Sequence, residues 1–104
     1  MTEEQQIQLA REIGRQLPEV TRNDWTRWMQ LAQREGLEKA LHWTEQMAKD
    51  VTLRPAPKRA ADLIAKTVRS CRPTLAKLPA VEQAQVFGYV SRILAIETVR
   101  GSMH

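Results

Sequence analysis

The chain has 104 residues, of which 42% are hydrophobic and 27% are charged, and its formal net charge is +4. These proportions are typical of a folded globular protein and exclude a disordered or fibrous chain. The length predicts a single domain, residues 1–104, with one hydrophobic core. The longest apolar runs, such as residues 93–96, are far shorter than the roughly twenty residues that cross a bilayer, so we expect no membrane partner.

The first six residues and the cysteine content bear on location. Residues 1–6 are acidic and polar, whereas an export signal begins with positive charge and continues with an apolar run. Cys71 is the only cysteine, so no intrachain disulfide can form, which is typical of proteins in reducing compartments. We therefore expect a cytoplasmic protein.

The first predicted helix lies between Thr2 and Pro18. Thr2 and Gln5 fit a capping box, in which each side chain bonds the other residue's backbone amide. Pro18 ends the helix because proline cannot continue the backbone hydrogen-bond pattern. Apolar and small residues recur at spacings of three and four, as on one helix face; they are Ile7, Ala10, Gly14 and Leu17.

Two further helices are predicted on either side of Gly36, which suits the left-handed conformation that ends a helix. The second helix begins after Thr21 or Asn23, either of which is a suitable N-cap. Its apolar stripe consists of Trp25, Trp28, Met29 and Ala32. The third helix follows almost without a loop, and its stripe consists of Leu37, Ala40, Leu41, Thr44, Met47, Ala48 and Val51. The two helices are expected to form a tight hairpin or a kinked pair.

The main internal break is predicted at residues 52–57, where Pro55 and Pro57 lack amide hydrogens. A fourth helix is expected from about Lys58 until just before Pro73. A short helical turn is expected over residues 74–78.

A final helix is predicted from Pro79, whose missing amide suits the first helical position, to about Val99. Its apolar residues cover most of the circumference, as in a helix buried on several sides. It is expected to be either the central core helix or a subunit interface. Since no alternating strand pattern is present, the sequence predicts an all-α fold, a compact bundle of about five helices with no strands.

The charge of residues 54–77 is the most unusual feature of the sequence. This segment holds seven basic residues and one acid, Asp62, whereas residues 1–53 hold nine acids and seven bases. On the predicted fourth helix the basic residues gather opposite the apolar side, along roughly 25–30 Å at helical rise. Lys and Arg contacts with phosphates release counterions and give affinity without reading sequence. We therefore predict contacts with the backbone of a single-stranded nucleic acid through Arg54, Lys58, Arg59, Lys66, Arg69, Arg72 and Lys77. A solvated surface or a contact with an acidic protein fits the pattern equally well.

The aromatic and apolar residues provide candidates for protein interfaces. Trp25 and Trp28 share the apolar stripe of the second helix, so we expect both in the core. Trp43 lies at the edge of the third helix's stripe, which favours partial exposure or an interface role. On the last helix, Tyr89 and Ile96 are candidates for contacts with other subunits or with a second copy of the chain.

The sequence gives little support for catalysis or metal binding. His42 falls on the polar side of its helix, and Cys71 is expected to face inward, so a thiol–imidazole pair would depend on the fold bringing them together. One cysteine and two distant histidines do not supply a metal site. Residues 32–36 have the spacing of a helix-turn-helix turn, but Lys39, His42 and Glu45 follow where apolar residues would be needed. We therefore expect no enzymatic activity, cofactor, metal or small-molecule substrate.

Three segments, together with the size and the helical layout, resemble the small helical subunits of type III CRISPR effector complexes. The segments are Leu17-Pro18, residues 35–41 and residues 87–94. The resemblance implies a non-enzymatic subunit of an RNA-guided nucleoprotein complex, stacked on copies of itself, with a basic surface facing the nucleic acid. The alternative is a protein–protein adaptor or homo-oligomeric module that does not bind nucleic acid.

Overall fold

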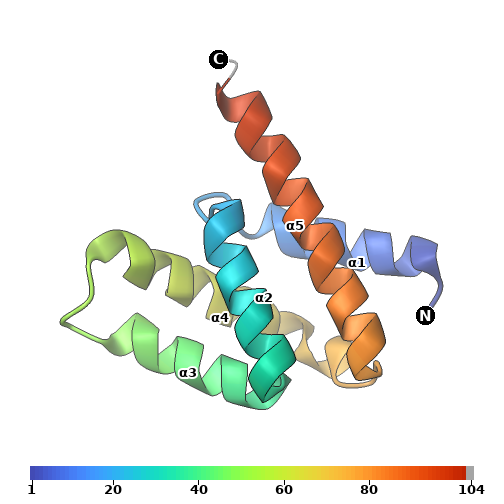
Figure 1. Cartoon of the computed structure of the whole chain (residues 1–104), viewed down its shortest axis with the longest axis horizontal. Coiled ribbons are helices and arrows are strands. Elements are labelled where there is room, and N and C mark those ends of the chain that lie inside the picture. Colours follow the sequence, from blue (N-terminus) through green and yellow to red (C-terminus); the bar gives the residue numbers. More distant parts are fainter. Residues whose placement is uncertain (103–104) are drawn as a thin grey trace.

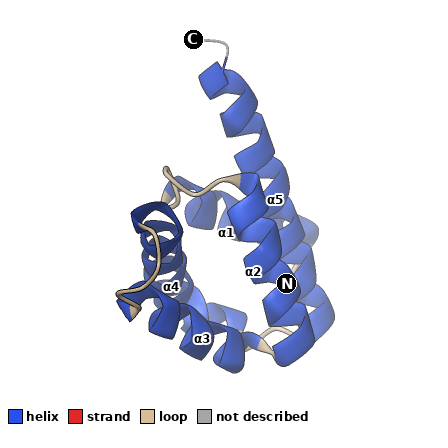
Figure 2. Cartoon of the chain, turned by 60° about the vertical axis from the view of Figure 1, so that its left-hand side comes forward, coloured by secondary structure: helices blue, strands red, loops and turns tan. Residues whose placement is uncertain are grey.

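The computed structural model describes the backbone of residues 1–102 and the side chains of residues 1–96. Five helices and no strand are present in this part of the chain, which confirms the predicted all-α bundle (Figures 1 and 2). The helices are α1 (Glu3–Arg15), α2 (Arg22–Glu35), α3 (Leu37–Lys49), α4 (Pro55–Leu75) and α5 (Ala80–Ser102). None of these helices is long and apolar enough to cross a membrane.

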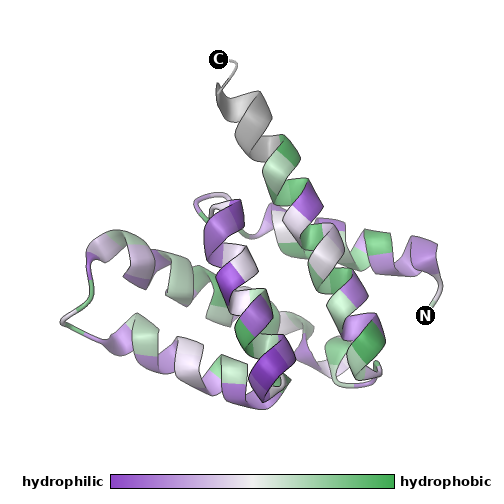
Figure 3. Cartoon of the chain, viewed as in Figure 1, coloured by the Kyte–Doolittle hydropathy of each residue, from purple (hydrophilic) through white to green (hydrophobic). Residues whose placement is uncertain are grey.

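The helices form two packed pairs with α2 between them. Helices α3 and α4 lie side by side and antiparallel, joined by the loop of residues 50–54, and α1 packs against α5 (Figure 1). Helix α2 contacts both α5 and α3, so it joins the two pairs. The C-terminal part of α5 projects beyond the other helices. Hydrophilic and hydrophobic stretches alternate along the helices, as expected for amphipathic helices around a shared core (Figure 3).

The core is centred on three aromatic rings. Trp25 and Trp28 of α2 are both buried, as predicted, and their ring centroids lie 5.8 and 5.1 Å from that of Phe87 on α5. Both contacts are edge-to-face, which aromatic pairs prefer over face-to-face stacking. The indole N–H of Trp25 donates to the backbone oxygen of Phe87 at 2.9 Å, so the buried polar atom has a partner. Helix α2 is therefore fixed to α5 by both packing and a hydrogen bond.

The predicted helix boundaries are confirmed where side chains cap the helices. Thr2 and Gln5 form the expected capping box of α1. Thr21, and not Asn23, caps α2, and Asp24 completes a second capping box. Gly36 has a φ of 91°, which disfavours any residue with a Cβ, so α2 ends and α3 begins at this position.

Helix α4 extends further than predicted at both ends. It begins at Pro55 and not near Lys58, because prolines are tolerated in the first turn, where amides have no partner within the helix. It ends at Leu75, so Pro73 lies inside the helix and the separate helical turn predicted after it is wrong. Proline lacks the amide hydrogen that would otherwise bond the backbone carbonyl of Arg69, which is an exposed residue. The break therefore consists of residues 50–54 rather than 52–57.

The predicted apolar stripes of α3 and α5 are buried over part of their length and become exposed towards their C-terminal ends. On α3 the stripe is buried from Leu37 to Thr44, but Met47 is 42% exposed and Val51, beyond the end of the helix, is 87% exposed. On α5, which begins one residue after Pro79, the residues from Val86 to Leu94 that belong to the core are buried, but Ile96 is 54% exposed. The side chain of Val99 lies outside the described residues. Both helices therefore present large apolar side chains to solvent at their C-terminal ends.

Candidate interaction surfaces

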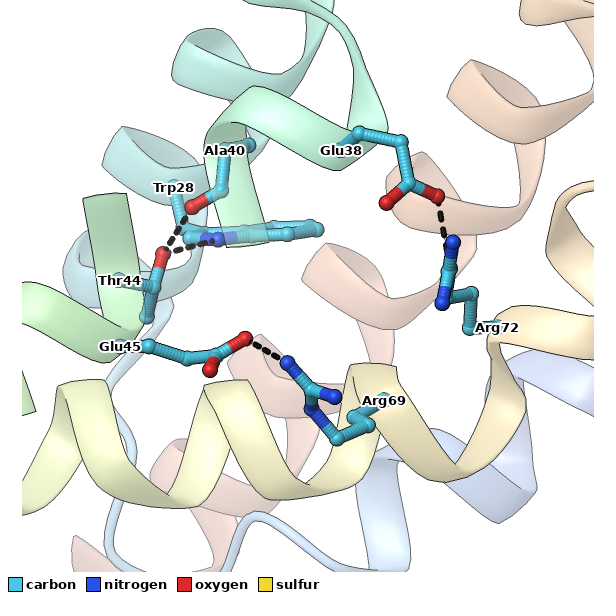
Figure 4. A network of polar contacts seen from close by, with 7 residues as sticks. All are labelled: Trp28, Glu38, Ala40, Thr44, Glu45, Arg69 and Arg72. Carbon is cyan, nitrogen blue, oxygen red and sulfur yellow. Dashed lines mark hydrogen bonds and ion pairs between the residues drawn. The ribbon is translucent and has the colours of Figure 1, made fainter. Parts of the chain in front are cut away.

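Two pairs of opposite charge line the edge between α3 and α4. Glu38 accepts a hydrogen bond from Arg72 at 2.7 Å, and Glu45 accepts one from Arg69 (Figure 4). The Arg69 hydrogen bond holds the pKa of Glu45 below its ordinary value. This edge is called the charge seam below.

Beyond the charge seam, Asp50 in the loop after α3 accepts hydrogen bonds from Thr52. These hydrogen bonds hold the pKa of Asp50 below its ordinary value, and the positive charge of Lys58 contributes to the lowering. In the charge seam, Glu38 precedes Glu45 along α3, and their partners Arg72 and Arg69 follow α4 in reverse order. Opposite charges at facing positions are the pattern expected of two antiparallel helices in register.

Most of the seven basic residues predicted to bind nucleic acid, called the basic ridge, have a carboxylate partner within the chain. Besides the two arginines of the charge seam, Arg59 contacts Glu19 at 3.4 Å and Lys66 contacts Asp62 at 3.0 Å. Among the described residues, Arg54, Lys58 and Lys77 have no carboxylate within 4.0 Å. Three of these acids, Glu19, Glu38 and Glu45, lie outside the 54–77 segment, so they match half of its excess of six positive charges.

The basic ridge also divides between two sides of α4. Arg69 and Arg72 reach towards α3, whereas Arg59 reaches towards Glu19, in the segment that joins α1 to α2. The structure therefore brings these residues onto one helix, as predicted, but directs several of them to different neighbours. Whether the ridge binds nucleic acid stays a prediction.

A groove of about 310 Å³ lies between α2, α3 and α4. Its lining is mostly apolar, with charged side chains at the rim on the α2 side. The lining residues of this α2–α3–α4 groove are Asp24, Arg27, Trp28, Leu31, Arg34, Thr44, Met47, Pro57, Ala60, Ala61 and Ile64. Sequence reasoning missed the groove because it depends on how three helices are spaced, although the leucine and arginines of α2 do recur at helical spacing.

The buried polar side chains in the groove, those of Trp28 and Thr44, are already hydrogen-bonded within the chain. The indole N–H of Trp28 donates to the hydroxyl of Thr44 at 2.8 Å, and this hydroxyl donates to the backbone oxygen of Ala40 (Figure 4). No side-chain polar atom that is buried in the described residues lacks a partner. The buried part of the groove therefore offers apolar contact rather than free hydrogen-bonding groups.

An exposed apolar surface adjoins the groove on α3. Trp43 is 55% exposed, as predicted, and it lines a second hollow of about 380 Å³ together with Gln46, Met47, Lys49 and Asp50. Met47 lines both this hollow and the groove. The indole of Trp43, the thioether of Met47 and the groove therefore form one continuous surface, called the α3 surface below.

The other two predicted interface residues lie on α5. Tyr89 is half-buried, and its hydroxyl donates to Glu3 of α1 at 3.2 Å. Burial of the ring and this hydrogen bond raise the pKa of the Tyr89 hydroxyl. Tyr89 therefore takes part in the contact between α1 and α5, whereas Ile96 is exposed on the projecting part of α5.

No hydrogen bond joins His42 and Cys71, the residues considered for catalysis, in the described part of the chain. His42 is exposed and lies beside Trp43, with ring centroids 6.4 Å apart, whereas Cys71 is half-buried against the core. His104 lies outside the described residues. No group of three or more potential metal ligands occurs within the described part of the chain.

The two candidate surfaces differ in how much of their chemistry is used inside the chain. In the basic ridge, four of the seven cations already contact a carboxylate. On the α3 surface, a large part of Trp43 and Met47 still faces solvent. No protein-family model, no curated protein and no solved structure matches this chain.

Proposed function

We propose that the chain is a non-enzymatic helical module that binds another protein through the α3 surface. The observation that carries the proposal is the exposure of Trp43 (55%) and Met47 (42%) beside an apolar groove. Tryptophan and methionine are enriched at the centres of protein interfaces, where charged residues are depleted. An exposed apolar patch with a polar rim is also a common mark of a binding site.

The energetics of burial support the same function. Removing a large apolar side chain from water stabilises a complex by about 1.5–3 kcal/mol when burial is complete. Trp28 and Thr44 under the groove are fixed by hydrogen bonds, so little ordering of this surface is needed on binding. A partner that covers Trp43 and fills the groove thus gains apolar contact at a small entropic cost.

Site-specific cross-linking tests the proposal. A photoreactive phenylalanine analogue replaces Trp43 or Met47, with exposed Gln8 of α1 as the matched control position. We expect a protein adduct at positions 43 and 47 that is absent at position 8. The cross-linked protein, once purified, should bind the wild-type chain at least tenfold more tightly than the Met47→Asp variant, with helicity unchanged by circular dichroism. Equal adducts at all three positions, or binding unaffected by Met47→Asp, would contradict the proposal.

Nucleic-acid binding is the second candidate, as a helical subunit of a nucleoprotein complex. It is supported by Arg54, Lys58 and Lys77, which have no carboxylate within 4.0 Å among the described residues. The paired cations of the basic ridge are exposed, so a phosphate can replace their carboxylate partners. In this function the ridge contacts the backbone of a single strand, as the resemblance to type III CRISPR small subunits implies.

Fluorescence anisotropy with a labelled single-stranded RNA tests this second function. Three phosphate contacts predict that log affinity falls with log salt with a slope of about −2, since each contact to a single strand contributes roughly 0.7. Replacing Arg54, Lys58 and Lys77 together by Gln should remove most of this slope. No binding at low salt would exclude the function, and cross-links to RNA from positions 54 and 58 rather than 43 would favour it over protein binding.

A further inference from the structure

The rim of the α2–α3–α4 groove carries two exposed arginines on one face of α2. Asp24, Arg27, Leu31 and Arg34 line the groove and follow one another at spacings of three and four, which places them on one stripe of the helix. Arg27 and Arg34 are seven residues apart, or about 10 Å along the helix axis. They flank Leu31, which is half-buried.

Both arginines are available to a partner. Arg27 has no carboxylate within 4.0 Å in the described part of the chain, and Arg34 has only the neighbouring Glu35 at 3.6 Å, with 72% of the Arg34 side chain exposed. The acid in the groove lining is Asp24, whose carboxylate accepts the backbone N–H of Thr21 at 3.4 Å in the capping box of α2. The rim therefore presents net positive charge.

The interior of the groove requires an apolar occupant. Trp28 and Ile64 are buried there, and the hydroxyl of Thr44 donates one hydrogen bond and accepts another within the chain. The volume of about 310 Å³ corresponds to roughly ten water molecules at about 30 Å³ each. Apolar side chains that enter the buried part of the groove leave no buried side-chain polar atom of the described residues without a partner, because these atoms are already bonded within the chain.

We infer that the partner segment is an acidic amphipathic helix, which seats an apolar stripe in the α2–α3–α4 groove and places two carboxylates against Arg27 and Arg34. The inference rests on the proposed protein-binding function and specifies the chemistry of the partner. Helix-in-groove recognition uses anchors at i, i+3, i+4 and i+7. Carboxylates seven residues apart on such a helix lie on one face and about 10 Å apart, as the two arginines do.

An extended segment does not meet the same geometry. About 10 Å along a strand corresponds to three residues, and side chains three residues apart point to opposite faces. One of the two carboxylates would then face away from α2. The described part of the chain also contains no strand to which an extended partner could pair its backbone.

A selection from a display library of amphipathic helical peptides tests the inference. The full chain serves as the target, and the Met47→Asp variant removes peptides that bind elsewhere. We expect the selected peptides to carry Asp or Glu at two positions seven residues apart, beside apolar anchors. Selected peptides with neutral or basic flanks, or no selection above the Met47→Asp background, would overturn the inference.

The affinity of one selected peptide then isolates the two arginines. Replacing Arg27 and Arg34 together by Gln should weaken binding about tenfold at low salt and remove most of its salt dependence. The matched control replaces Arg11 and Arg15 of α1 by Gln; both are exposed and neither lines the groove, so affinity should stay within about twofold.

The outcomes separate this inference from the proposed function. Cross-links at positions 43 and 47 together with neutral or basic selected peptides would keep protein binding and reject the acidic helix. Equal weakening by the α1 control pair would indicate a general charge effect and also reject it. Absence of position-specific cross-links would reject the proposed function itself.

Discussion

The contact of α2 and α1 with α5 and the contact of α3 with α4 are stabilised by different kinds of side chain. Around α5, the fully buried residues include Trp25, Phe87 and Ile13, which are large. Between α3 and α4 many of the buried residues are alanines, namely Ala40, Ala60, Ala61 and Ala65. The edge of this second contact carries the charge seam, with its ion pairs in solvent.

This difference bears on which part of the fold is free to bind. The large apolar residues near α5 are buried within the chain, so they contribute to stability and are inaccessible to a partner. On α3, Trp43 and Met47 stay exposed although the helix is well packed on its other face. The α3–α4 hairpin therefore combines several buried alanines on its inner side with exposed apolar side chains on α3.

The sharpest test of this comparison exchanges one tryptophan on each side for alanine. Trp25→Ala should lower the free energy of unfolding by about 3–5 kcal/mol, because it removes a fully buried ring and leaves a cavity. Trp43→Ala should change it by less than about 0.5 kcal/mol, as for most surface substitutions. Urea unfolding followed by circular dichroism measures both. Similar losses in the two variants would mean that Trp43 belongs to the core.

The hydrogen-bond chain under the groove gives the next largest effect. Thr44→Val removes the acceptor of the Trp28 indole N–H and should cost about 1–3 kcal/mol, since a buried donor is left without a partner. Thr44→Ser keeps the hydroxyl and is the matched control. A Val variant no less stable than the Ser variant would show that the hydrogen bond contributes little to stability.

The fold was predictable from local sequence patterns, and the errors in the predicted helix boundaries also have local causes. The capping box at Thr2, the turn at Gly36 and the buried tryptophans of α2 follow from spacing and residue type alone. The prolines at positions 55 and 57 suggest a break in the sequence, although proline is favourable in the first helical turn. Pro73 suggests the end of the helix, whereas α4 continues through it to Leu75.

The partners of the basic ridge could not be predicted without the order of the helices in space. A signal was nevertheless present in the sequence. The position numbers of Glu38 with Arg72, and of Glu45 with Arg69, add to nearly the same value, as they must for residues facing one another across an antiparallel hairpin. Two acids of the first half of the chain, Glu38 and Glu45, therefore face α4.

Charge reversal tests how much the charge seam contributes to the stability of the α3–α4 hairpin. Glu38→Arg combined with Glu45→Arg places like charges opposite Arg72 and Arg69, so we expect a lower unfolding temperature at low salt and a smaller loss at high salt. Adding Arg69→Glu and Arg72→Glu restores opposite charges in reversed order and should recover most of the loss. Failure of the fourfold variant to recover would mean that the original side chains contribute through packing.

The pH dependence of stability gives a smaller effect at the same seam. The hydrogen bond from Arg69 lowers the pKa of Glu45 from 4.5 in the folded state. The Arg69 hydrogen bond therefore stabilises the fold at pH values above the pKa that Glu45 has in the unfolded chain. This stabilisation is lost as the pH falls through the pKa that Glu45 has in the folded state. The difference in unfolding temperature between the wild type and Arg69→Gln should therefore be constant near neutral pH and narrow below about pH 4.5. A difference that stays constant through this range would contradict the assignment.

The smallest expected effect compares two helical glycines near the contact between α1 and α5. A Cβ at Gly88 of α5 meets no atom within 4 Å, so Gly88→Ala should stabilise the chain by about 0.5–1 kcal/mol through helix propensity alone. At Gly14 of α1 a Cβ would lie 3.0 Å from Cγ2 of Ile93, so Gly14→Ala gains the same propensity but forces α5 or its side chain to shift. We expect the gain in helix propensity and the steric cost nearly to cancel at Gly14.

The control is an Ile93→Ala background, in which the side chain that a Cβ at position 14 would meet is shortened. Gly14→Ala should then stabilise the chain as much as Gly88→Ala. Equal stabilisation in the wild-type background would instead mean that α1 and α5 can separate slightly without lowering the free energy of unfolding. The contact between α1 and α5 would then be packed less tightly than the structure indicates.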